Sequence, residues 1–89
     1  MALLKDLDEL DTNGERGDWC FINEDTYIAI RYGEDIISTV VLPITGNSGW
    51  KWNGNRDSPT LSPSILVYGK PDWNEGWHGW LRNGILETA

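Results

Sequence analysis

The pair Asn83-Gly84, with short segments on both sides that read as strands, constrains the fold of this chain more than any other feature. Asn-Gly is a preferred sequence of the two-residue type I′ turn, because that turn needs a positive φ at both central residues. Residues 77–82 and 85–88 flank the pair and have the usual length of β-strands. The segment therefore predicts an antiparallel β-hairpin.

Similar short patterns, separated by turn residues, occupy most of the chain before this hairpin. Residues 26–32 alternate, which puts Ile28, Ile30 and Tyr32 on one face of a strand. Residues 36–42 are rich in β-branched side chains, which suit a pleated sheet. We expect a mainly β fold, a small antiparallel sheet or partly open barrel of five to seven short strands. The predicted strands are residues 19–22, 26–32, 36–42, 50–52, 64–68, 77–82 and 85–88.

One short helix is predicted ahead of the strands. Residues 2–11 place Leu3, Leu4, Leu7 and Leu10 on one helical stripe with acidic residues opposite, and Asn13-Gly14 ends the pattern. We divide the chain into an acidic amphipathic helix or arm at residues 1–14 and a single small β domain at residues 15–89. Because isolated helices this short are marginal, the helix either packs on the domain or captures a partner.

The net charge of −7 is concentrated in residues 1–35, which hold ten acidic and three basic residues. Such a surface repels nucleic acid phosphates, so no nucleic acid partner is expected, whereas it suits a basic groove on another protein or serves solubility alone. No apolar run approaches the ~20 residues of a membrane span, so we expect a cytoplasmic protein without a membrane partner.

Cysteine and histidine each occur once, as Cys20 and His78. Neither an internal disulfide nor a four-ligand zinc site can be built from them alone, so no metal and no cofactor is expected. Cys20 is interpreted as a half-buried thiol in a strand. Six tryptophans can give these 89 residues a small aromatic core, because each ring buries ~150–250 Å².

The Ser62-Pro63-Ser64 step and His78 could form a nucleophile and its base. A serine hydroxyl is a weak nucleophile until a neighbouring base takes its proton, and imidazole is the usual base. Ser64 is preferred over Ser62 because it follows the proline at the start of a predicted strand. Glu75, or alternatively Asp72, could orient the imidazole.

Two other interpretations of the same residues stay open. The serines could satisfy backbone amides at a turn while His78 serves as a hydrogen-bonded core residue. Alternatively, the chain could be a binding protein rather than an enzyme, with tryptophans and an arginine around His78 forming a contact surface, because Trp and Arg are enriched at such surfaces. The candidate binding residues are Trp73, Trp77, Trp80 and Arg82.

Four motifs carry a resemblance to a known family: W-x-W-x-G at residues 50–54, P-T-L-S-P-S-I at residues 59–65, W-H-G-W-L at residues 77–81, and the turn glycine Gly84. They resemble the domain of unknown function number 6527, small phage and bacterial proteins that are often labelled ammonia monooxygenases in phage genomes. Many relatives carry a Cys-rich knuckle before the tryptophans, which is absent here.

The resemblance implies a small phage-type accessory protein. Some relatives occur in bacterial ubiquitin-like conjugation operons, where the domain looks like a serine peptidase acting on the modifier. A Ser/His hydrolase acting on a host ubiquitin-like or other protein tail is thus the expected function. The expected partner is a host or phage protein, or else a peptide or small molecule, and the chain is expected to be a monomer or small homo-oligomer.

Overall fold

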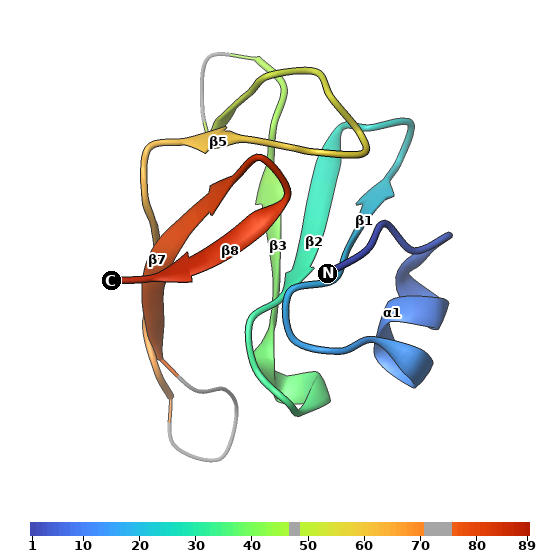
Figure 1. The fold of residues 1–89 in the computed structure, drawn as a ribbon, viewed down its shortest axis with the longest axis vertical. Coiled ribbons are helices and arrows are strands. Elements are labelled where there is room, and N and C mark those ends of the chain that lie inside the picture. The colour runs from blue at the N-terminus through green and yellow to red at the C-terminus, as the bar shows by residue number, and fades with distance from the viewer. Residues whose placement is uncertain (47–48, 71–75) are drawn as a thin grey trace.

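Three small antiparallel sheets and one short α-helix make up the described part of the chain, residues 1–46, 49–70 and 76–89 of a computed structural model (Figure 1). The sheets have the strand orders β1-β2-β3, β4-β5 and β6-β7-β8, and they do not close into a barrel among these residues. The mainly β prediction is confirmed. The elements are α1 (Leu7–Asn13), β1 (Trp19–Ile22), β2 (Tyr27–Arg31), η1 (Ile36–Ser38), β3 (Thr39–Pro43), β4 (Lys51–Trp52), β5 (Leu61–Ser62), β6 (Ile65–Val67), β7 (Trp77–Arg82) and β8 (Ile85–Thr88).

The helix is shorter than the sequence predicted. Residues 2–4 are extended beside β1, because Trp19 N donates to Ala2 O at 3.0 Å and Leu4 N donates to Trp19 O at 2.8 Å. The carboxylate of Asp6 then accepts from Glu9 N at 2.9 Å and caps the helix, which begins one residue later. Backbone pairing with β1 therefore replaces the first turn of the predicted helix, whereas its predicted end at Gly14 is confirmed.

The second difference lies between β2 and β3. Residues 36–38 form the 3₁₀ turn η1 rather than the start of a strand, and β3 begins at Thr39. Ser38 N donates to Asp35 O at 2.8 Å, and Tyr32 N donates to Ser38 O at 2.8 Å. These bonds reverse the direction of the chain so that β3 can pair with β2. The hydrogen bonds of this turn therefore outweigh the β propensity of Ile36 and Ile37.

The two faces of the β1-β2-β3 sheet pack against different parts of the chain. Trp19, Phe21, Ile28 and Ile30 point into the main core, which β5 to β8 complete from the other side. The opposite face carries Cys20 and Ala29, which pack against Leu10 of α1. Figure 1 shows α1 beside β1, away from β7 and β8. The helix is thus part of the packed structure, with Leu10 fully buried.

A buried arginine joins the end of the helix to this sheet. Arg31 of β2 donates to Leu10 O at 2.8 Å, to Gly14 O at 3.2 Å and to the Thr39 hydroxyl at 2.9 Å. The last carbonyl groups of a helix lack partners within the helix, and a cation there is favoured by the helix dipole. Arg31 therefore holds the end of α1 against the sheet through two hydrogen bonds, and the third joins it to β3.

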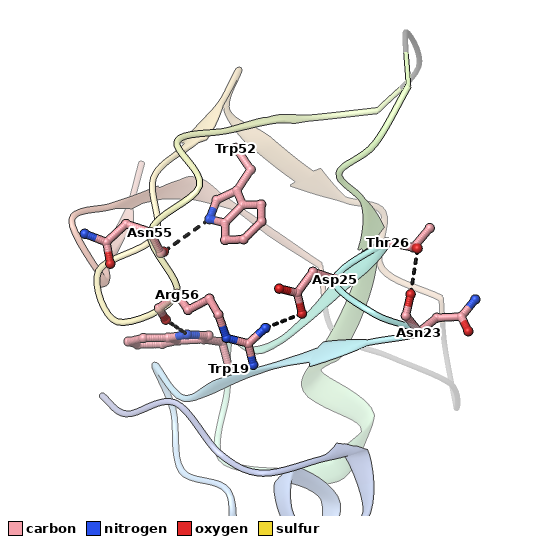
Figure 2. A network of polar contacts seen from close by, with 7 residues as sticks. All are labelled: Trp19, Asn23, Asp25, Thr26, Trp52, Asn55 and Arg56. Carbon is pink, nitrogen blue, oxygen red and sulfur yellow. Dashed lines mark hydrogen bonds and ion pairs between the residues drawn. The ribbon is translucent and has the colours of Figure 1, made fainter.

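Residues 53–60 form a loop that is fastened to the turn and first strand of the β1-β2 hairpin (Figure 2). The indole N–H of Trp19 donates to Arg56 O at 3.1 Å, and the Arg56 side chain pairs with Asp25. That guanidinium also lies 4.6 Å from the centre of the Phe21 ring. The contact with Asp25 raises the pKa of Arg56 further above its ordinary value. The loop is therefore anchored by one residue at three points, through its backbone carbonyl and twice through its side chain.

The predicted hairpin at residues 77–88 is confirmed. Arg82 pairs with Ile85, and the two turn residues have φ values of 52° for Asn83 and 74° for Gly84, as a type I′ turn requires. Gly84 N donates to Pro59 O at 2.9 Å. The turn thus holds residue 59 in place, which positions the segment leading into β5 and β6 against β7. No helix among the described residues is long and apolar enough to cross a bilayer.

Candidate active site

Ser64 and His78 lie side by side on the outer face of the third sheet. Ser64 directly precedes β6, whose pairing with β7 places Leu66 opposite His78. Side chains two residues apart on a strand share a face, so Ser64 is the diagonal neighbour of His78. The Ser64 Oγ lies 3.3 Å from the His78 Nε2, and His78 is exposed. The register of β6 on β7 is what brings the two groups together.

The distance between these groups allows proton transfer from serine to imidazole. A tight hydrogen bond between a hydroxyl and a ring nitrogen spans ~2.6–3.2 Å, and catalytic pairs are often longer in the absence of substrate. The 3.3 Å between Ser64 Oγ and His78 Nε2 is typical of a catalytic pair without bound substrate. The arrangement can therefore lower the barrier to nucleophilic attack by Ser64, with His78 as the base.

Backbone contacts hold both residues in place. The indole N–H of Trp50 donates to Ser64 O at 3.3 Å, and Ala89 N donates to His78 O at 2.9 Å. Ile65, next to Ser64, is fully buried and anchors the start of β6. The imidazole also lies beside the Trp80 ring, with 5.8 Å between ring centres. The sequence gave no signal that the Trp50 N–H would reach Ser64.

Position 79, directly after the histidine, has no room for a side chain. A Cβ at this position would collide with Glu87 O of β8 and with the indole of Trp77. Gly79 therefore lets β8 and the Trp77 ring approach β7 closely, on the face opposite His78. Close approach of other groups to the backbone is a common reason for glycine inside a strand.

A pocket of about 480 Å³ opens beside Ser64. Ser64 forms part of its wall, whereas His78 is not among the residues that line it. Ser62, the second candidate serine, also lines it; this residue is exposed and lies in β5 opposite Lys51. Of these two serines, Ser64 is the one whose hydroxyl contacts the His78 imidazole. The pocket residues are Thr60, Leu61, Ser62, Pro63, Ser64, Trp80, Arg82 and Asn83.

The candidate binding residues lie on different faces of β7. The Trp77 side chain points inward, stacks on Tyr32 with 5.7 Å between ring centres, and donates to the Thr88 hydroxyl at 3.0 Å. Its indole therefore supports the fold. Trp80 and Arg82 lie on the same face as His78, with the Arg82 guanidinium 4.7 Å from the centre of the Trp80 ring. The remaining candidates, Asp72, Trp73 and Glu75, lie outside the described residues.

Cys20 is fully buried rather than half-buried as predicted, because α1 covers that face of the sheet. Burial, with Asp6 and Asp11 nearby, raises the pKa of its thiol to about 11. Cys20 is therefore a packing residue and not a reactive thiol. Among residues 1–46, 49–70 and 76–89, no cluster of three or more His, Cys, Asp and Glu side chains could hold a metal ion.

A family model described as "Bacterial ubiquitination-like system serine protease (BubE)" matches residues 12–89. The chain belongs to the BubE family. The match covers every strand of the described structure as well as Ser64 and His78. No match was found among curated proteins or among solved structures. The BubE description agrees with the predicted link to bacterial ubiquitin-like systems and with a serine peptidase, whereas the resemblance to the domain of unknown function 6527 stays a prediction.

Proposed function

We propose that this BubE chain is a serine peptidase of a bacterial ubiquitination-like system, with Ser64 as nucleophile and His78 as general base. The observation that carries the proposal is the 3.3 Å contact between Ser64 Oγ and His78 Nε2, on an exposed face and beside a pocket. The family description supports the class of reaction.

The proposed reaction follows the usual course of acyl transfer to serine. His78 Nε2 takes the hydroxyl proton as Ser64 Oγ attacks the carbonyl carbon of the scissile amide. The protonated imidazole then gives that proton to the leaving amine, and an ester between Ser64 and the acyl part of the substrate remains. Water hydrolyses the ester with His78 again as the base, which restores the free hydroxyl. No cofactor takes part.

The imidazole works best when its second nitrogen is oriented by an acceptor. Glu75, three residues before His78, is the proposed acceptor, and Asp72 is its alternative. The proposed substrate is a protein tail, from a ubiquitin-like protein or another host or phage protein, and the proposed location is the cytoplasm. These assignments follow from the family description and the sequence.

Cleavage of defined protein tails tests the proposal. Purified chain is incubated with ubiquitin-like proteins that carry C-terminal extensions, and the products are weighed by mass spectrometry. We expect cleavage by the wild type, loss of turnover in Ser64→Ala and in His78→Ala, and little further loss in the double variant, because the two groups act as one unit. Thr12→Ala, which removes an exposed hydroxyl from α1, is the matched control.

Either of two outcomes contradicts the assignment. If Ser62→Ala abolishes turnover while Ser64→Ala retains it, the nucleophile is Ser62. If the Ser64→Ala protein cleaves as fast as the wild type, neither the contact with His78 nor the pocket beside it serves catalysis.

A further inference from the structure

The pocket beside Ser64 has a chemical character that bears on what the proposed peptidase accepts. Its walls come from residues 60–64 on one side and from the end of β7 and its turn on the other. Most of the polar groups there are neutral hydroxyls and amides. Among the described residues that line it, Arg82 alone has a charged side chain. The pocket therefore presents one positive charge close to the proposed nucleophile.

The Arg82 guanidinium lies over an aromatic ring and near a carboxylate. It stacks over the Trp80 ring, 4.7 Å from the ring centre, and its Nη1 lies 3.7 Å from the Glu87 carboxylate. Stacking on an aromatic face orders a guanidinium and leaves its edge, which carries the N–H donors, free to meet an anion. A ligand that pairs with Arg82 thus meets a cation that is already oriented.

The ion pair between Arg82 and Glu87 is weak, so a carboxylate of a ligand can pair with Arg82 more strongly than Glu87 does. A separation of 3.7 Å exceeds the 2.7–3.2 Å of a good N–H to O hydrogen bond. Both side chains are about half exposed, at 50% for Arg82 and 47% for Glu87, and ion pairs between such groups contribute little. A carboxylate in the pocket can therefore make the direct, charge-assisted hydrogen bonds that Glu87 does not make.

We propose that this pocket is a specificity subsite for a substrate carboxylate close to the scissile bond, paired by Arg82 above Trp80. The inference rests on the proposed peptidase function and names what that site selects. The carboxylate can belong to an Asp or Glu side chain or to the free C-terminus of the substrate. The chain carries a net charge of −7 and does not attract acidic peptides as a whole, so the preference for a carboxylate comes from Arg82 alone. Salt should weaken this preference because it screens exposed charges.

The test compares substrates that differ in one group. Internally quenched heptapeptides carry Glu or Gln at each position around the cleaved bond, and each is made with a C-terminal carboxylate or carboxamide. We expect a kcat/KM at least about tenfold higher for one acidic member than for its neutral twin. A Glu/Gln difference identifies a side-chain carboxylate, and a carboxylate/carboxamide difference identifies the terminus. A ratio near one for every pair overturns the inference.

Two charge changes should shift this ratio in opposite directions. Arg82→Gln should bring it to about one, whereas Glu87→Gln should raise it, because the competing carboxylate is gone. Lys5→Gln removes one positive charge from an exposed residue of the N-terminal segment, and its ratio should equal that of the wild type. If Arg82→Gln keeps the full wild-type ratio, Arg82 does not bind the carboxylate and the inference is wrong.

A binding measurement separates this inference from the proposed function. The same peptides, labelled with a fluorophore, are titrated with the Ser64→Ala protein, and anisotropy reports Kd without turnover. If the wild type cleaves nothing while acidic peptides still bind about tenfold more tightly through Arg82, the peptidase is wrong and the carboxylate site stands. If the wild type cleaves acidic and neutral peptides alike, the peptidase stands and the carboxylate site is wrong.

Discussion

His78 Nε2 and Ser64 Oγ lie 3.3 Å apart although 14 positions separate the two residues in the chain. The pairing of β6 with β7, in which Leu66 faces His78, produces this proximity. A slip of one residue in that register would turn one of the two groups to the opposite face of the sheet. The candidate site therefore depends on the features that fix the position of β7.

Gly79→Ala should damage both the fold and the site. Its Cβ would meet the Glu87 carbonyl and the Trp77 ring, so β8 or the ring must move. We expect a loss of roughly 2 kcal/mol or more in the free energy of unfolding by urea. Gly54→Ala is the control: its φ of 82° strains alanine, but among the described residues no atom beyond its chain neighbours lies within 4 Å of the added Cβ, so about 1 kcal/mol is expected. Equal losses would contradict this account of Gly79.

Trp50→Phe should lower kcat, because it removes a contact that positions Ser64. It removes the N–H that holds the Ser64 carbonyl at 3.3 Å but keeps an aromatic ring against the core. A hydrogen bond of this kind contributes about 1 kcal/mol, so kcat should fall roughly threefold to tenfold with a small change in KM. Trp52→Phe, two residues further along the chain, is the matched control, since its N–H donates to Asn55 O instead. A fall in kcat of the same size in both variants would exclude a positioning role for Trp50.

The contact between α1 and the sheet should contribute substantially to stability. Leu10 is fully buried against Cys20 and Ala29, so Leu10→Ala should cost roughly 2–5 kcal/mol in urea unfolding. Leu7 is only half-buried, and Leu7→Ala should cost clearly less. If Leu10→Ala leaves the transition unchanged, the helix does not pack on the sheet in solution.

Alkaline pH should destabilise the fold through Cys20. Its pKa rises from an ordinary 9.0 to about 11 in the folded chain, so the folded state keeps the thiol proton more firmly than the unfolded state does. The resulting stability is complete below pH 9 and is lost as the pH rises to about 11, on the order of 2 kcal/mol. Urea unfolding of wild type and Cys20→Ala measures it. The stability difference between them should shrink over this range, and a constant difference would contradict the burial of a neutral thiol.

Local patterns were sufficient to predict the hairpins, because turn chemistry and alternation are local properties. Asn83-Gly84 has the positive φ values that its sequence predicts, and the alternating Ile28 and Ile30 are fully buried. The first helical turn and the strand at residues 36–38 were predicted wrongly. Residues 2–4 form backbone hydrogen bonds with Trp19, which is distant in the sequence, and residues 36–38 form the hydrogen bonds of a chain reversal. Both sets of bonds outweighed the local pattern, and a single sequence does not reveal such partners.

The candidate site was predictable only in part for the same reason. The chemistry of serine and histidine suggested the pair of Ser64 with His78. The pocket was not predictable, because it depends on how the β7-β8 turn meets residues 59–60. Three hydrogen bonds set that contact: Gly84 N donates to Pro59 O, Asn83 N donates to the Thr60 hydroxyl, and that hydroxyl donates to Asn83 Oδ1 at 3.5 Å.

Labelling by a fluorophosphonate probe tests the central claim most directly, because such probes react with a serine hydroxyl that a neighbouring base has activated. The account predicts one adduct per wild-type chain, located by peptide mass spectrometry at Ser64. Ser64→Ala and His78→Ala should not be labelled, although circular dichroism should show both folded, and Thr12→Ala should be labelled like the wild type. An adduct at another residue, or folded wild type that never reacts, would contradict the assignment of Ser64 and His78.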